Sequence, residues 1–138
     1  MNAPCDILIV DDEESITELL ADVLTDVGYT VQCAYDGASA LVAVQEQLPA
    51  LILLDNMMPI LSGIEVVRTL RAAGYTQLPI IMMSAGTAAE PLRQAGATTV
   101  LPKPFMLDEV VSCIERYCGR AWSPPVRPGD TLIRTVGR

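Results

Sequence analysis

The sequence predicts an α/β domain in which the strands of a parallel sheet alternate with helices along the chain. Short runs of β-branched and aliphatic residues recur, and several are apolar throughout, which is typical of strands covered by helices on both faces. Between these runs, apolar residues recur at three- and four-residue intervals, as on the buried face of a helix. The 138 residues, 51% of them hydrophobic, suffice for one core but hardly for two domains.

The elements follow one another as five strand–helix pairs. Strands are expected at residues 7–10, 30–34, 51–54, 80–83 and 98–101. Helices are expected from apolar stripes at 16–27, 38–48, 64–70 and 107–118, with a weaker one, interrupted by Pro91, at 88–95. Glycines predict where four of these helices end, at Gly28, Gly74, Gly96 and Gly119. This order predicts a doubly wound, flavodoxin-like (βα)5 domain with a five-stranded parallel sheet over residues 5–118.

The last part of the chain, residues 119–138, breaks the pattern. Its prolines and glycines are typical of a tail or linker. Four arginines against Asp130 give it a charge of +3, and since the whole chain carries −8, residues 1–118 carry −11. We therefore predict an extended tail that lies against an acidic face of the domain; the alternative is a linker without such contacts.

Composition excludes several classes of function. The chain has no histidine, which rules out histidine metal sites, serine triads with a histidine base, and a histidine phosphocarrier within it. Its negative charge disfavours direct nucleic-acid binding. No apolar run approaches the roughly 20 residues of a membrane helix, and no signal peptide is evident, so we expect a cytoplasmic protein without membrane insertion. The four cysteines form no C-x-x-C pair and are expected to be reduced and mostly buried.

Polar residues follow each expected strand, at the edge where ligands bind to parallel sheets. They are Asp11-Asp12-Glu13-Glu14, Tyr35-Asp36, Asp55, Ser84 and Lys103, the only lysine in the chain. Each has a simpler explanation when taken alone: a helix cap for Asp12, a turn residue for Asp55, a loop hydroxyl for Ser84, a surface charge for Lys103. Their joint occurrence at successive strand ends favours a common site.

Phosphoryl transfer to a carboxylate is the chemistry that this set suits. Clustered carboxylates at Asp11, Asp12 and Asp55 repel one another, and Mg²⁺, which prefers oxygen ligands, removes that repulsion. A carboxylate such as Asp55 can attack a phosphoryl group to give an acyl phosphate. A lysine and a hydroxyl can neutralise and orient the phosphoryl oxygens.

The sequence resembles the receiver domains of bacterial two-component response regulators over residues 5–118. The matching motifs are ILIVDDE at 7–13, LLDNMMP at 53–59 with Gly63 beyond it, MSA at 83–85 and LPKPF at 101–105. The resemblance implies that Asp55 is the phosphoacceptor. It also implies a Mg²⁺ site, with Mn²⁺ as a possible substitute, formed by Asp55, Asp12, Asp11 acting largely through water, and the backbone carbonyl of Met57.

The resemblance also assigns the remaining site residues. Ser84 corresponds to the hydroxyl residue that binds the phosphoryl group, and Lys103 to the family's lysine. The bond between Lys103 and Pro104 corresponds to the family's cis peptide. Two departures stand out, because Val100 replaces the usual Tyr or Phe and the stretch from Ser84 to Lys103 is shorter than usual. Both fall on the face that usually signals output, so they question the usual switch and not phosphorylation.

The function expected from this resemblance is that of a stand-alone signalling domain. It would accept a phosphoryl group from a histidine kinase or a histidine phosphotransfer protein and act through an unknown output protein or a phosphorelay. It would be no enzyme beyond catalysing its own phosphorylation and dephosphorylation. The alternatives are a metal-dependent phosphohydrolase with an Asp55 nucleophile, which usually carries an acid where this chain has Met57, and a phosphorylation-independent binding module.

Overall fold

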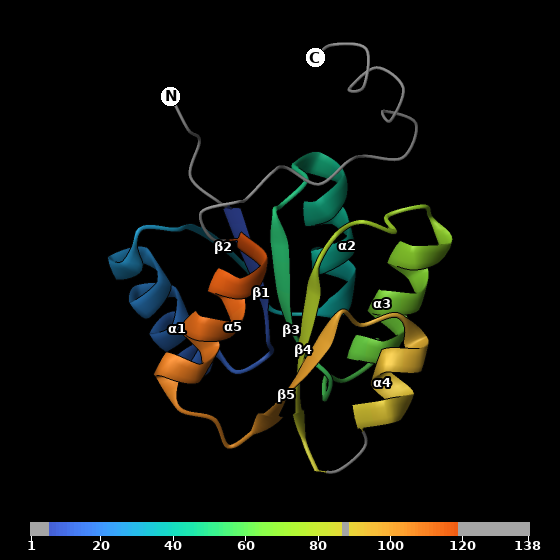
Figure 1. The fold of residues 1–138 in the computed structure, drawn as a ribbon. Coiled ribbons are helices and arrows are strands. Elements are labelled where there is room, and N and C mark those ends of the chain that lie inside the picture. The colour runs from blue at the N-terminus through green and yellow to red at the C-terminus, as the bar shows by residue number, and fades with distance from the viewer. Residues whose placement is uncertain (1–5, 87–88, 119–138) are drawn as a thin grey trace.

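The computed structural model describes residues 6–86 and 89–118, and it confirms five strand–helix pairs (Figure 1). The strands are β1 (Asp6–Val10), β2 (Thr30–Ala34), β3 (Leu51–Asp55), β4 (Ile80–Ala85) and β5 (Thr99–Lys103). The helices are α1 (Glu14–Val27), α2 (Gly37–Glu46), α3 (Gly63–Ala72), α4 (Ala89–Ala95) and α5 (Leu107–Cys118). The predicted tail at 119–138 and the predicted domain start at Cys5 lie outside the described residues.

All strands are parallel and lie in the order β2-β1-β3-β4-β5. Helices α1 and α5 cover one face of the sheet, and α2, α3 and α4 cover the other (Figure 1). The strand order reverses between β1 and β3, so the chain leaves these two strands toward opposite faces. The carboxyl ends of β1 and β3 therefore border the crevice where such sheets bind ligands.

The core consists of two layers, one on each side of the central strands. Leu8, Val10 and Leu54 pack toward α2, α3 and α4, while Ile7 and Leu53 pack toward α1 and α5. Strand β3 is buried at every position, as its apolar run Leu51–Leu54 predicted, and its last residue, Asp55, is buried as well. Strand β2 lies at an edge of the sheet, and its Thr30 and Gln32 are exposed.

Two helices differ from the sequence prediction. On α1, the apolar stripe is wider than the buried face, because Leu19 and Val27 are 48% and 47% exposed. Pro91 does not interrupt α4; it lies in the first turn, where a proline needs no backbone donor. No helix in the described part of the chain is long and apolar enough to cross a membrane. The described cysteines are free thiols, with Cys118 buried and Cys33 and Cys113 partly buried.

Arg71, near the end of α3, joins two connections, the one between α3 and β4 and the one between α4 and β5. Its Nε donates to the carbonyl of Gly96 at 3.0 Å, and its Nη1 donates to the carbonyls of Tyr75 and Leu78 at 2.5 and 2.9 Å. Its Nη2 also donates to Thr98 Oγ1 at 3.4 Å. Burial lowers the pKa of this guanidinium, and its hydrogen bonds give these backbone carbonyls a charged donor.

Replacing Arg71 with methionine is expected to lower the free energy of unfolding by about 2–3 kcal/mol, because partly buried carbonyls lose a charged donor. Urea denaturation measures this change. Arg68→Met on the exposed side of the same helix is the matched control and should have little effect. Equal losses for the two variants would show that Arg71 does not hold these connections together.

Candidate functional site

The carboxyl ends of four strands bring the predicted site residues to one edge of the sheet. Asp11 follows β1 directly, Asp55 is the last residue of β3, Ser84 is the second-to-last residue of β4, and Lys103 ends β5. Carboxylate oxygens of Asp11, Asp12 and Asp55 all lie within 4.8 Å of one another. The structure thus brings together residues that are up to 92 positions apart in the sequence.

Asp11 is fully buried at the centre of this cluster. Its Oδ1 accepts a hydrogen bond from the backbone N–H of Glu13 at 3.0 Å, while its Oδ2 is buried without a hydrogen-bond partner. Burial raises the pKa of Asp11, and the nearby negative charges of Asp55 and Asp12 raise it further. A buried carboxylate oxygen that lacks a donor and faces two more carboxylates is suited to a hard divalent cation.

Lys103 supplies the positive charge of the site. Its Nζ lies 2.9 Å from Oδ1 of Asp55, and both side chains are largely buried, with 25% and 4% exposed. Burial alone would lower the pKa of Lys103, but the hydrogen bond and charge of Asp55, with Asp11 and Glu13, raise it above its usual value. The ammonium is therefore charged at neutral pH. The peptide bond between Lys103 and Pro104 is cis, as predicted.

The other residues that the sequence placed at this edge of the sheet occupy different positions. Ser84 is buried at the end of β4. Met57 lies in the connection after β3 with its side chain 68% exposed. Asp12 does not cap α1, because the N-cap residue is Glu13. Asp36, which also follows a strand, accepts a hydrogen bond from the Ser39 N–H at 2.7 Å and caps α2, so it is not part of the carboxylate cluster.

The sequence did not predict the roles of two residues that shape the site. Buried Thr17 donates from its hydroxyl to the carbonyls of Asp11 at 3.3 Å and Glu13 at 2.9 Å, which fixes the turn carrying the acidic residues. A threonine within an apolar helical stripe was the only signal for this role. Asn56, next to Asp55, has a buried Oδ1 without a hydrogen-bond partner; it belongs to the LLDNMMP motif, but the motif did not indicate this burial.

Gly63 was noted as part of a motif, and the structure explains why a glycine is needed. A Cβ at this position would lie 2.6 Å from the backbone oxygen of Asp55 and 2.8 Å from Cα of Asn56. The N–H of Gly63 donates to the carbonyl of Asn56 at 3.0 Å. The first residue of α3 therefore packs directly against the backbone that carries Asp55.

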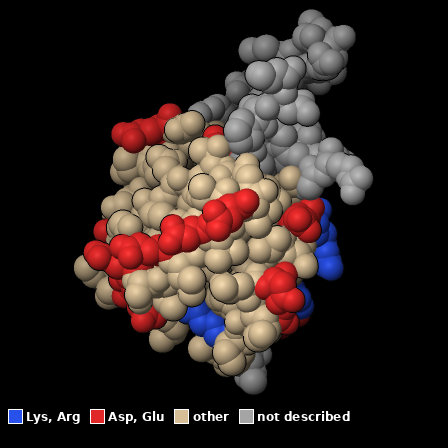
Figure 2. All heavy atoms as spheres, turned by 90° about the vertical axis from the view of Figure 1, so that its left-hand side faces the viewer, with Lys and Arg blue, Asp and Glu red and all other residues tan. Residues whose placement is uncertain are grey.

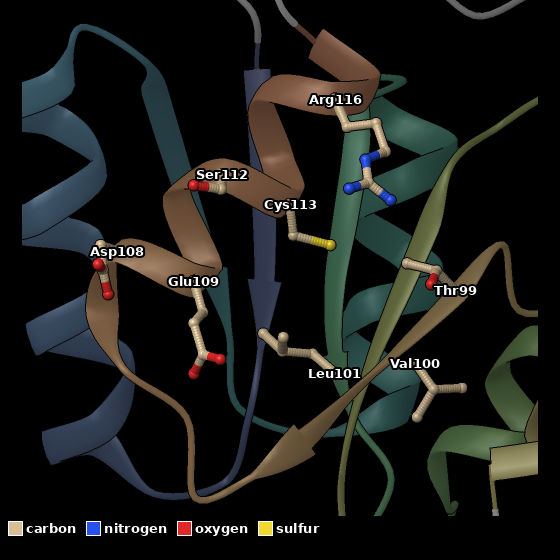
Figure 3. A pocket seen from close by; sticks show the side chains of 8 residues that line it. All are labelled: Thr99, Val100, Leu101, Asp108, Glu109, Ser112, Cys113 and Arg116. Carbon is tan, nitrogen blue, oxygen red and sulfur yellow. The ribbon is translucent and has the colours of Figure 1, made fainter.

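A hollow of about 350 Å³ lies between β5 and α5 (Figure 3). Leu101 belongs to the core layer under α5, whereas Val100 packs toward the opposite layer, so the two side chains leave β5 in opposite directions. Val100 is the residue that departs from the usual aromatic. It is not one of the residues of the carboxylate cluster.

The comparisons with known proteins agree with this geometry. Residues 7–115 match the family described as the response regulator receiver domain. Response regulator MprA of Mycobacterium ulcerans is 42% identical over 132 residues, which cover 94% of this chain and 56% of that protein. The chain therefore spans little more than half the length of this relative.

Two solved structures show the same fold. Chemotaxis protein CheY4 of Vibrio cholerae superposes with a TM-score of 0.79 at 33% identity, covering 84% of this chain and all of that one. The receiver domain of NtrX from Brucella abortus gives a TM-score of 0.77 at 31% identity with the same coverage. Together with the family match and the acidic cluster, these similarities show that the chain belongs to the response regulator receiver domains, the phosphoacceptor domains of two-component signalling.

Proposed function

We propose that Asp55 is the residue that accepts the phosphoryl group, and that Asp11, Asp12, Ser84 and Lys103 assist it. The observation that carries this proposal is the convergence of three carboxylates within 4.8 Å, with the ammonium of Lys103 2.9 Å from Asp55. Such a cluster is typical of sites that bind a metal ion and a phosphoryl group together.

Mg²⁺ is the cofactor that these residues fit, and Mn²⁺ is a plausible substitute. The donors would be Asp11, Asp12, Asp55 and the backbone carbonyl of Met57, which are all oxygen ligands of the kind that Mg²⁺ prefers. The unpartnered Oδ2 of Asp11 supports this assignment. When bound, the ion neutralises part of the negative charge of the phosphoryl group and of the acidic cluster.

The chain's own residues account for the transfer step. A carboxylate oxygen of Asp55 attacks phosphorus, a new O–P bond forms, and the bond from phosphorus to the donor's imidazole nitrogen breaks, leaving its electron pair on that nitrogen. Lys103 holds Asp55 in place before the step and binds a phosphoryl oxygen afterwards. The hydroxyl of Ser84 binds another phosphoryl oxygen.

The phosphodonor we propose is a histidine kinase or a histidine phosphotransfer protein in the cytoplasm. The chain itself has no histidine, so the phosphohistidine must come from another protein. Output then passes through contacts with a further protein or through onward transfer in a relay. Residues 1–118 carry a net charge of −11, which makes direct nucleic-acid binding by this part of the chain unfavourable.

A phosphohydrolase with the same nucleophile fits the site less well. Such an enzyme needs a general acid near the nucleophile to protonate the leaving group. The residue two positions after Asp55 is Met57, and its exposed side chain cannot donate a proton. We therefore favour a phosphoacceptor over a hydrolase.

Phosphorylation by acetyl phosphate is expected to require Mg²⁺ or Mn²⁺ and to fail in Asp12→Ala. The reason is that removing one of three clustered carboxylates removes a ligand of the ion. Intact-mass spectrometry measures the gain of one phosphoryl group. Asp26→Ala, which removes an exposed acid at the far end of α1, is the control and should be labelled normally. Labelling that persists with a chelator present would contradict the metal-assisted step.

A further inference from the structure

The outer edge of strand β2 offers backbone groups that nothing in the described chain binds. Strand β2 lies at one edge of the sheet and pairs with β1 alone. The carbonyl of Ala34 accepts a hydrogen bond from the N–H of Asp11 at 3.2 Å, so Ala34 directs its backbone groups toward β1. Neighbouring residues of a strand direct these groups to opposite sides. Val31 and Cys33 therefore direct their N–H and C=O groups away from β1, to the outside of the sheet.

This outer edge lacks the features by which proteins usually keep a further strand from adding to a sheet. The sequence of β2, TVQCA, contains no charged residue and no proline, and both commonly protect edge strands. The strand at the opposite edge, β5, contains Lys103 and also Pro102, which has no N–H. Only the β2 edge is thus fully open to main-chain hydrogen bonds with an added strand, a common way of binding extended peptides.

An acidic row on α1 lies beside the β2 edge. Glu14, Glu18 and Asp22 are exposed and follow one another at intervals of four residues, so they share one side of the helix. Figure 2 shows acidic side chains running across the side of the molecule that carries α1. Burial raises the pKa of the Cys33 thiol, and the charge of Glu18 raises it further. Desolvation raises the pKa of Tyr35, which follows β2, and the charges of Glu14 and Glu18 add to this effect.

We propose that the β2 edge binds an extended segment of another protein that carries a basic residue at every second position. The segment adds to the sheet as a further strand, its main chain bonded to Val31 and Cys33 and its basic side chains paired with the acidic row. Charge complementarity supports this occupant, because α1 contains acids and no base. A second copy of this chain would instead bring two acidic rows together.

The spacing of the acidic row also fits such a segment. Four residues of a helix rise about 6 Å, and two residues of a strand rise about 6.6 Å. Side chains at every second position of the added strand point to the same face of the sheet. Successive basic residues on the face that carries α1 can therefore each meet one acid of the row.

Titration of the full, unphosphorylated chain with a capped peptide, RVRVR, tests the proposal by nuclear magnetic resonance. The peptide has the five-residue length of β2 and alternates arginine with valine. We expect the amide signals of Val31 and Cys33 to shift and to saturate. The peptide RRRVV has the same charge without the alternation, and it should bind more weakly. Equal affinity of the two peptides would overturn the proposal, because charge alone would then explain the binding.

A pair of variants tests the acidic row. Glu18→Gln should weaken the binding of RVRVR by about two- to fivefold, the effect of losing one exposed ion pair. Glu115→Gln, an equal change of charge at an exposed position of α5, should leave the affinity unchanged. Equal affinities of the two variants would contradict the pairing with the acidic row.

Methylation of the peptide's backbone nitrogens tests the main-chain bonds. An added strand turns the N–H groups of alternate residues toward β2, so these are the N–H groups either of the arginines or of the valines. Methylating one set should abolish binding, and methylating the other should preserve it. Binding of both methylated peptides, or unchanged signals of Val31 and Cys33 with RVRVR, would overturn the proposal. Signals of Val31 that change with protein concentration alone would also overturn it, because a second copy would then occupy the edge.

Discussion

Lys103→Met is expected to slow phosphorylation of Asp55 by about 10²-fold or more, the usual effect of removing one preorganised charged donor from a reaction site. Lys103 is the only lysine in the chain, and its Nζ lies 2.9 Å from Oδ1 of Asp55. Without it, Asp55 faces Asp11 and Asp12 with no positive charge from the protein. The incoming phosphoryl group, which is itself negative, then meets three carboxylates.

The rate of phosphoryl incorporation from acetyl phosphate at fixed Mg²⁺ measures this effect. Lys103→Arg keeps the charge but replaces a compact ammonium with a planar guanidinium, so its rate should be intermediate. Arg116→Met, on the exposed side of α5, is the control and should leave the rate unchanged. A Lys103→Met rate equal to that of Arg116→Met would show that the ion pair only supports the fold.

Gly63→Ala is expected to destabilise the domain by about 3 kcal/mol, at the upper end of what overpacking usually causes. The new Cβ would lie 2.6 Å from the backbone oxygen of Asp55. Backbone at the end of a buried strand cannot move aside as a flexible side chain can, so α3 or Asp55 must shift. The same shift should slow phosphorylation, because it moves the acceptor relative to Asp11 and Lys103.

Gly37→Ala provides the comparison. A Cβ there would lie 2.9 Å from Cβ and Cδ2 of Leu61, and this partly buried side chain in the loop before α3 can shift more easily than strand backbone can. Urea denaturation should therefore show a smaller loss for Gly37→Ala than for Gly63→Ala. The reverse order would mean that the contact between α3 and Asp55 is not the critical one.

The fold was predictable because its signals are local and repeated. Strand Leu51–Asp55 is apolar up to a terminal acid, and helix ends at residues such as Gly28 carry positive φ, so pattern and turn chemistry agree. What the sequence could not show was how exposed each apolar residue is. Leu19 belongs to the apolar stripe but is half exposed, and strand Thr30–Ala34 lies at an edge. Exposure of this kind depends on which neighbours the topology supplies.

The candidate site was predictable from one topological rule, that parallel strands end at a common edge. That rule placed Asp11, Asp55 and Lys103 together correctly, but it also included Asp36, which caps α2 instead. Thr17 and Asn56 were missed because their roles depend on hydrogen bonds to, or burial beside, backbone that only the folded chain brings near. The effect of Val100 on the usual switch stays a prediction. Beryllofluoride with Mg²⁺ mimics the phosphoryl group, and it should shift the backbone magnetic resonance signals of Ser84 strongly and those of Val100 only slightly.

Identifying the residue to which the phosphoryl group attaches tests most directly whether Asp55 is the phosphoacceptor. The full chain is incubated with acetyl phosphate and Mg²⁺, and the intact mass is compared with that of Asp55→Asn, which keeps the size of the side chain but removes the nucleophilic carboxylate. We expect one added phosphoryl group in the unaltered chain, removed by hydroxylamine as acyl phosphates are, and none in Asp55→Asn. Labelling of Asp55→Asn to the same extent, or a label that maps to another residue, would contradict the central claim.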